Sequence, residues 1–84
     1  MTSSGDIVGK TLTARVVRIE PHGLYLAYED ATILVLIVDV SENPIRDLRE
    51  AFQSGEEVNV RVLRYIQEYG MYKGSMIAVH GDRR

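Results

Sequence analysis

The sequence predicts an all-β fold: a five-stranded Greek-key barrel with one short helix between the third and fourth strands. Short segments rich in β-branched residues, several with alternating apolar and polar side chains, make up most of the chain, and a single stretch has helical periodicity. The chain also has only 84 residues and no cysteine, so no disulfide can stabilise a small open sheet. Closing the sheet into a barrel removes the free strand edges that invite aggregation.

The first two strands are expected at residues 11–19 and 24–28. Apolar side chains alternate with others along the first strand, at Leu12, Ala14 and Val16. The adjacent Val16 and Val17 break this alternation, which predicts a β-bulge that bends the strand. Residues 20–23, Glu-Pro-His-Gly, form the predicted turn between the two strands.

Three further strands are expected. Residues 32–40 are apolar almost throughout and are predicted to form a strand buried on both faces. Residues 57–66 form the fourth strand, in which three inward-facing valines alternate with other side chains (Val58, Val60 and Val62). The fifth strand is expected at 75–79, after a loop at 69–74 that contains two glycines.

The helix is expected after Asn43 and Pro44, a favourable pair for an N-cap and a first helical position. Apolar residues then recur at helical spacing, at Ile45, Leu48 and Phe52. Gly55 is the predicted stop.

Length and composition indicate one domain, which we place at residues 8–80 with short tails at 1–7 and 81–84. No apolar run approaches the roughly 18 residues that a membrane span needs, so no membrane partner is expected. The first residues, MTSSGD, lack the basic and apolar segments of a signal peptide, which favours a cytoplasmic protein. The formal net charge is −2, so a nucleic-acid partner requires basic residues clustered on one face.

Several segments, in their order and spacing, resemble the S1 RNA-binding domain family, which has the oligonucleotide-binding (OB) fold. The resemblance runs from about Val8 to Val79. Its elements are Val8-Gly9 with the bent first strand, His22-Gly23-Leu24-Tyr25-Leu26, Leu34 to Ser41, and Gly55-Glu56-Glu57-Val58-Asn59-Val60-Arg61-Val62-Leu63. The last of these is the best match, to the family's Gly-Asp-x-Val-x-Val-x-Val segment.

This resemblance implies RNA contacts at two aromatic positions around the second strand and at a histidine on the third. Here those positions hold His22, Tyr25 and Leu36, so the residue type is kept only at Tyr25.

Tyr25 is the main candidate for stacking on a base, an interaction worth about 1–3 kcal/mol. The alternative is an amphipathic tyrosine at the barrel rim. His22 can stack on a base or, when charged, bind a phosphate; the alternative is an exposed turn histidine. The expected loop adds the rings of Tyr69 and Tyr72 and the cation of Lys73, with the alternative that its tyrosines fold back on the barrel.

Arginines of the first and fourth strands are candidate phosphate contacts. Their guanidinium groups pair with phosphate and stack on bases. Because the two strands are neighbours in the predicted topology, four arginines are expected on adjoining surface: Arg15, Arg18, Arg61 and Arg64. The alternative is a solvated face whose arginines pair with Glu20 or Glu57.

Catalysis is not expected. The two histidines, His22 and His80, lie far apart in the sequence, and there is no cysteine, HExxH helix or Gly-rich phosphate loop. The chain is therefore predicted to be a non-catalytic module without cofactor or metal. It would bind single-stranded RNA, with single-stranded DNA as an alternative ligand, as an accessory in translation or RNA metabolism.

A protein partner in a ribonucleoprotein is a further expectation. The alternative function is an OB-fold protein-interaction module or homodimer that has lost RNA binding, with an apolar patch formed by Leu34 and Leu36 if both are exposed.

Overall fold

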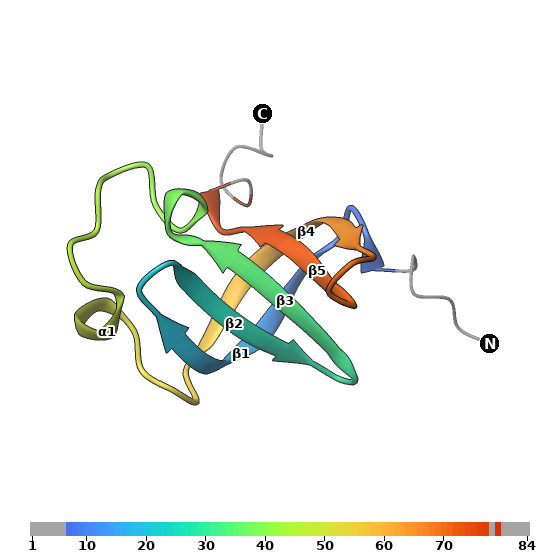
Figure 1. The fold of residues 1–84 in the computed structure, drawn as a ribbon, viewed down its shortest axis with the longest axis horizontal. Coiled ribbons are helices and arrows are strands. Elements are labelled where there is room, and N and C mark those ends of the chain that lie inside the picture. Colours follow the sequence, from blue (N-terminus) through green and yellow to red (C-terminus); the bar gives the residue numbers. More distant parts are fainter. Residues whose placement is uncertain (1–6, 78, 80–84) are drawn as a thin grey trace.

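The computed structural model describes residues 7–77 and 79 and shows a closed five-stranded barrel (Figure 1). Its strands are β1 (Thr11–Glu20), β2 (Gly23–Tyr28), β3 (Ala31–Leu36), β4 (Glu57–Ile66) and β5 (Met71–Ser75). They follow one another around the barrel in the order β1-β2-β3-β5-β4, and β4 closes on β1. The pair β3 and β5 is parallel, and the other pairs are antiparallel. The predicted fold class is confirmed.

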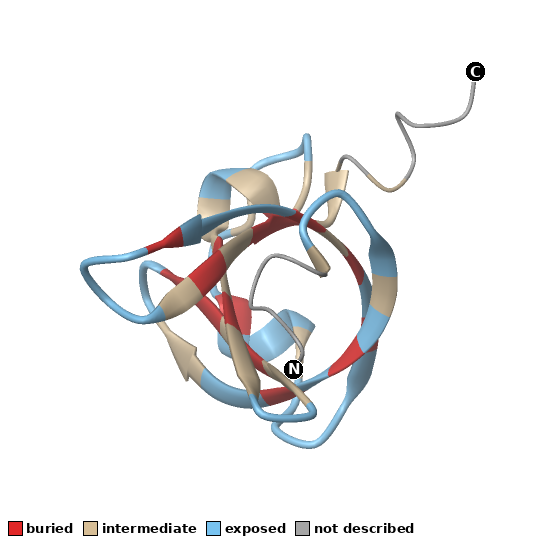
Figure 2. Cartoon of the chain, turned by 90° about the vertical axis from the view of Figure 1, so that its right-hand side faces the viewer, coloured by how far each residue is buried: buried red, intermediate tan, exposed pale blue. Residues whose placement is uncertain are grey.

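The core lies inside the barrel and is built by alternate residues of each strand (Figure 2). The three valines of β4 point inward as predicted and are buried. Opposite them lie the other most buried side chains, Val16, Leu24, Leu26, Ile33 and Val35. The intervening residues of each strand form the outer surface, so alternation in the sequence decides which side chains can meet a ligand.

Two β-bulges interrupt this alternation. In β1 the pairing with β2 skips Val17, as predicted from the Val16-Val17 doublet. In β4 the pairing with β5 skips Leu63, a bulge that was not predicted. In each bulge two consecutive residues face outward, Val17 with Arg18 and Leu63 with Arg64.

The third strand is shorter than predicted. It ends at Leu36, and residues Ile37–Asp39 form a 3-10 turn, η2, so the prediction of a strand to residue 40 is wrong. The expectation of burial on both faces is also wrong, because Leu34 and Leu36 face the outside of the barrel and are only half-buried. A barrel has one interior, and on its outside Leu34 and Leu36 line an open groove.

The helix is also shorter than predicted. Helix α1 spans only Leu48–Ala51, and its N-cap is Asp47, whose Oδ1 accepts a hydrogen bond from the Arg49 backbone N–H at 3.0 Å. The prediction of a cap at Asn43 is wrong. The Asn43 backbone N–H donates to Ser41 Oγ at 3.1 Å in a local turn instead. Among the described residues, no helix is long and apolar enough to cross a membrane.

The fifth strand lies earlier than predicted, at Met71–Ser75 rather than 75–79. The loop before it is therefore only 67–70, where Gly70 has a positive φ of 67°. Gly74, taken from the sequence as a loop residue, lies inside the barrel. A Cβ there would come within 2.7 Å of methyl groups of Ile33 and Val60, so only glycine fits without a shift of its neighbours.

The domain boundaries are only partly described. Ile7, which we assigned to the N-terminal tail, packs against the core. The rest of that tail and the predicted C-terminal tail at 81–84 lie outside the described residues, as do residues 78 and 80.

Candidate nucleic-acid interface

A shallow groove of about 410 Å³ crosses the outer face of β2, β3, β5 and β4. We call it the outer groove. Its lining residues are His22, Tyr25, Leu34, Leu36, Arg64, Ile66, Tyr69, Met71 and Lys73. The groove thus combines rings, cations and apolar side chains on a surface open to solvent.

The strand registers align five outward-facing side chains across the barrel. Arg18 of β1 pairs with Tyr25 of β2, and Tyr25 pairs with Leu34 of β3. Leu34 pairs with Lys73 of β5, which in turn pairs with Arg64 of β4. We call this set the cross-strand row: a cation at one end, then a ring, an aliphatic side chain and two cations. Paired residues on one face have Cβ atoms about 5 Å apart, so each neighbouring pair is within contact range.

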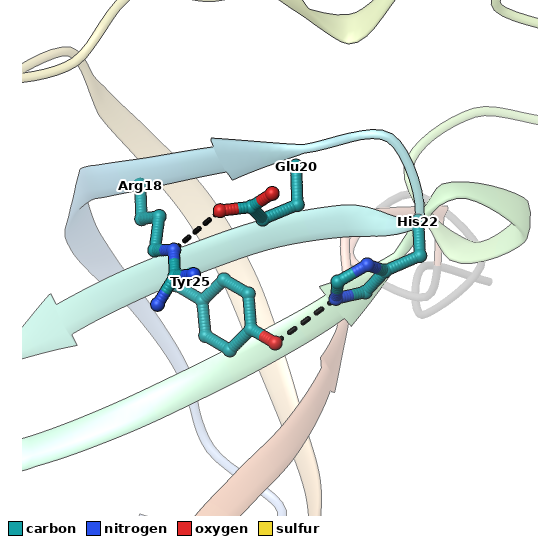
Figure 3. A network of polar contacts seen from close by, with 4 residues as sticks. All are labelled: Arg18, Glu20, His22 and Tyr25. Carbon is teal, nitrogen blue, oxygen red and sulfur yellow. Dashed lines mark hydrogen bonds and ion pairs between the residues drawn. The ribbon is translucent and has the colours of Figure 1, made fainter.

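Tyr25 is held by its neighbours on both sides (Figure 3). A hydrogen bond of 2.9 Å joins its hydroxyl to His22 Nε2, and the two rings meet edge to face with centroids 5.7 Å apart. On the other side, the guanidinium carbon of Arg18 lies 5.4 Å from the centroid of the Tyr25 ring, within range of a cation–π interaction. The ring is half-buried, which leaves part of it open to the groove.

Arg18 is also paired with a carboxylate. Its Nε donates a hydrogen bond to Glu20 Oε2 at 2.5 Å. This hydrogen bond, with the positive charge of Arg18, lowers the pKa of the Glu20 carboxyl below its usual value. The same bond and the charge of Glu20 raise the pKa of Arg18.

At the far end of the row, Lys73 and Arg64 bring two cations together. Lys73 Nζ lies 3.8 Å from Asp39 Oδ2, which belongs to η2. Arg64 is exposed, and no ion pair joins it to another described residue.

Five of the eight predicted site residues come together in the outer groove or at its edge: Arg18, His22, Tyr25, Arg64 and Lys73. All three positions implied by the family resemblance, His22, Tyr25 and Leu36, line the groove.

Arg15 and Arg61 lie outside the row. Strands β1 and β4 are neighbours as predicted, but Arg15 pairs with Glu57 and Ala27, and Arg61 pairs with Thr11 and Ser75. The expected single surface of four arginines is therefore not formed, because the pairs of β1 with β4 run from Thr11 to Arg15, short of Arg18, and set Arg15 opposite Glu57.

Tyr72 is not a loop residue, and that prediction is wrong. It lies in β5 facing the core and is only 5% exposed. Its ring packs at 64° against Tyr65, with centroids 4.9 Å apart. The ring therefore has no open face for a base, and we leave Tyr72 out of the proposed contacts.

Tyr69, the other ring of the expected loop, is 68% exposed and lines the outer groove from the β4–β5 turn. Its ring is therefore open to a ligand, unlike that of Tyr72.

The described residues, 7–77 and 79, contain no group of three His, Asp or Glu side chains that could hold a metal ion.

Comparisons with known proteins identify the family of this domain. A family model described as S1 RNA binding domain matches residues 6–71. Polyribonucleotide nucleotidyltransferase of Aquifex aeolicus is 32% identical over 66 residues, covering 79% of this chain and 8% of that protein. General stress protein 13 of Bacillus subtilis is 33% identical over 64 residues, covering 75% of this chain and 49% of that protein. The chain thus spans half or less of these relatives.

Solved structures show the same fold. The solution structure of the Bacillus subtilis stress protein superposes with a TM-score of 0.76 at 31% identity, covering 87% of this chain and 57% of that one. A chain in the a/eIF2alpha–aDim2p–rRNA complex from Pyrococcus horikoshii gives a TM-score of 0.73 at 25% identity, covering 82% and 43%. With the family model matching most of its length, this chain belongs to the S1 RNA-binding domain family.

Proposed function

We propose that this domain binds single-stranded RNA in the outer groove and acts as a non-catalytic module. The observation that carries the proposal is the cross-strand row, because single-strand binding by such barrels needs a stacking surface and cations along the backbone path. Tyr25 supplies the stacking surface, and Leu34 beside it offers an apolar contact to the next base. Arg18, Lys73 and Arg64 lie where phosphates on either side of these bases would pass.

The row fits a short stretch of nucleic acid. Five neighbouring strands about 4.8 Å apart span roughly 19 Å along the curved surface. That length corresponds to a few nucleotides, near the low end of the about 4–16 that OB folds accommodate. Tyr69 at the β4–β5 turn offers a second ring beyond Lys73 for a base at that end.

The comparisons support RNA as the ligand. The family is described as an RNA-binding domain, and one structural neighbour comes from a complex that contains rRNA. On this basis we propose an accessory role in translation or RNA metabolism, with the domain seated in a larger ribonucleoprotein. The protein-interaction alternative has less support, because Leu34 and Leu36 are half-buried and line the groove together with rings and cations rather than forming a separate apolar patch.

An NMR titration tests the proposal. Short oligo(U) and oligo(A) are added to labelled protein at low salt, with oligo(dT) as the DNA counterpart. We expect the largest chemical-shift changes at Tyr25, Leu34 and Lys73. Shifts centred elsewhere, or no response at millimolar RNA, would count against RNA binding at this face.

A pair of matched variants sharpens the test. Arg64→Gln removes a cation from the row, whereas Arg15→Gln makes the same change off the row. Each phosphate contact to single-stranded RNA contributes about 0.7 to the slope of log K against log salt, so Arg64→Gln should lower the slope by about that amount. Equal effects of the two variants would mean that general charge, rather than the row, attracts the RNA.

A further inference from the structure

Two of the three cations in the cross-strand row are already paired with carboxylates of this chain. Arg18 is bound by Glu20, which lies two residues further along β1. The contact engages Nε and holds the guanidinium beside the Tyr25 ring (Figure 3). The Arg18 side chain is two-thirds exposed, so a phosphate can approach it from solvent. The carboxylate of Glu20, however, already binds its Nε.

Lys73 is paired in a similar way from a different element. Asp39 of η2 lies 3.8 Å away, and both side chains are about one-quarter exposed. Asp39 is held in position because its backbone carbonyl accepts a hydrogen bond from Met76 N–H at 2.9 Å. This bond fixes the backbone that carries the Asp39 carboxylate next to the end of β5.

These pairs change the charge that RNA meets. The row carries three positive charges, and Glu20 and Asp39 together supply two negative ones. A phosphate that binds Arg18 or Lys73 must displace the carboxylate from the cation or share the cation with it. A displaced carboxylate attracts a cation from solution, which offsets the counterion release that drives nucleic-acid binding.

We infer that Glu20 and Asp39 compete with RNA phosphates for Arg18 and Lys73, so that the outer groove is restrained by its own carboxylates. This inference rests on the proposed RNA-binding function. Glu20 and Asp39 then act through Arg18 and Lys73 and limit both the affinity for RNA and its dependence on salt.

The test compares two double variants that change the net charge equally. Glu20→Gln with Asp39→Asn removes both competing carboxylates. Glu42→Gln with Glu50→Gln removes two exposed carboxylates that do not line the groove. The dissociation constant for oligo(U) is measured by fluorescence anisotropy over a range of salt concentrations, and each variant is checked by its NMR spectrum and thermal melt.

Removing the two competing carboxylates should tighten oligo(U) binding by roughly two- to fivefold per substitution, the range expected for partly exposed ion pairs. The salt slope should become steeper by about 0.7 per substitution. The control pair should leave the slope unchanged. Inorganic polyphosphate, which has charge but no bases, should bind the Glu20→Gln, Asp39→Asn variant more tightly than it binds the wild type.

The other outcomes separate the two proposals. If the wild type binds oligo(U) and the carboxylate variant binds no tighter, or the control pair gains as much, the inference is wrong while RNA binding stands. Weaker binding after Glu20→Gln would also overturn it, since Glu20 would then assist Arg18 rather than compete for it. If no variant binds, the proposed function fails and the inference with it. Should Asp39→Asn disturb the fold, Glu20→Gln alone gives the same test at a surface position.

Discussion

Replacing the ring of Tyr25 separates stacking from the other contributions to binding. Tyr25→Leu keeps an apolar side chain opposite Leu34 but removes the flat ring and the hydroxyl that is bonded to His22. Tyr25→Phe keeps the ring and removes only the hydroxyl. Tyr28→Leu is a control for the strand itself, because Tyr28 lies on β2 and is half-buried but packs against the core and does not line the outer groove.

The expected loss follows from the position of the ring in the row. A base stacked on an aromatic side chain contributes about 1–3 kcal/mol. Since about 1.4 kcal/mol corresponds to a tenfold change in affinity, Tyr25→Leu should weaken oligo(U) binding about 5- to 150-fold. Tyr25→Phe should retain most of the affinity, because its ring can still stack on a base and beside Arg18.

Stability should change little in the same variants. The His22–Tyr25 hydrogen bond joins two side chains near the surface, and leucine fills much of the space of the ring. A loss below about 1 kcal/mol corresponds to a melting temperature only a few degrees lower for a domain of this size. Fluorescence anisotropy gives the affinities, and a thermal melt gives the stability.

Two results would refute this reasoning. If Tyr25→Leu binds oligo(U) as tightly as the wild type, the ring does not carry a base. If Tyr25→Phe loses as much affinity as Tyr25→Leu, the hydroxyl and its bond to His22 matter, and stacking does not explain the effect. A loss in Tyr28→Leu equal to that in Tyr25→Leu would point to a general disturbance of β2.

Two further predictions concern stability and titration. Gly74→Ala places a methyl group within 2.7 Å of Ile33 and Val60, so it should destabilise the fold by about 1–3 kcal/mol and lower the melting temperature by roughly 5–20 °C. Adding Val60→Ala makes room, so a double variant as unstable as the sum of the single variants would argue against crowding. Glu20 should titrate below its usual value of 4.5, because Arg18 donates a hydrogen bond to it, and Arg18→Gln should return the midpoint toward 4.5 in a carboxyl-detected NMR titration. Since the folded-state pKa of Glu20 is lowered, the stability that this pair contributes is present above about pH 4.5 and is lost as the pH falls through the folded-state pKa. A titration midpoint of Glu20 at or above 4.5 in the wild type would contradict the pairing.

The bounds of a strand could be predicted where inward apolar and outward side chains alternate along it. β4 has the predicted bounds because three inward valines alternate with outward residues over its first half. The bulge of β1 was predicted from the doublet Val16-Val17. The bulge of β4 carries the same signal, the doublet Val62-Leu63, but was not predicted from it.

The fifth strand could not be placed from the sequence because two glycines that look alike have different roles. Gly70 adopts a positive φ in a turn, whereas Gly74 lies in a strand whose interior has no room for a side chain. Only the packing of Ile33 and Val60 distinguishes the two. Because the predicted loop extended to Gly74, the buried Tyr72 was taken for an open ring like that of Tyr69.

The outer groove depends on registers that sequence alone does not reveal. Leu34 and Lys73 are neighbours through a parallel pairing of strands separated by the helix and β4. Nothing local in either segment encodes that pairing, since it follows from closing the barrel. The sequence could therefore name most of the row's members but not their order across the surface.

The two bulges connect the shape of the barrel to its proposed function. Without them, strict alternation would continue from the outward residues Arg15 and Arg61, and Arg18 and Arg64 would point into the apolar core. The skipped residues, Val17 and Leu63, restore an outward direction for both arginines. The same irregularities that let short strands bend around a small core therefore place a cation at each end of the row. Fold and proposed binding face thus depend on the same two extra residues. The register of β1 against β4, with Thr11 opposite Arg61, separates the two arginines along these neighbouring strands, so they lie at opposite ends of the row.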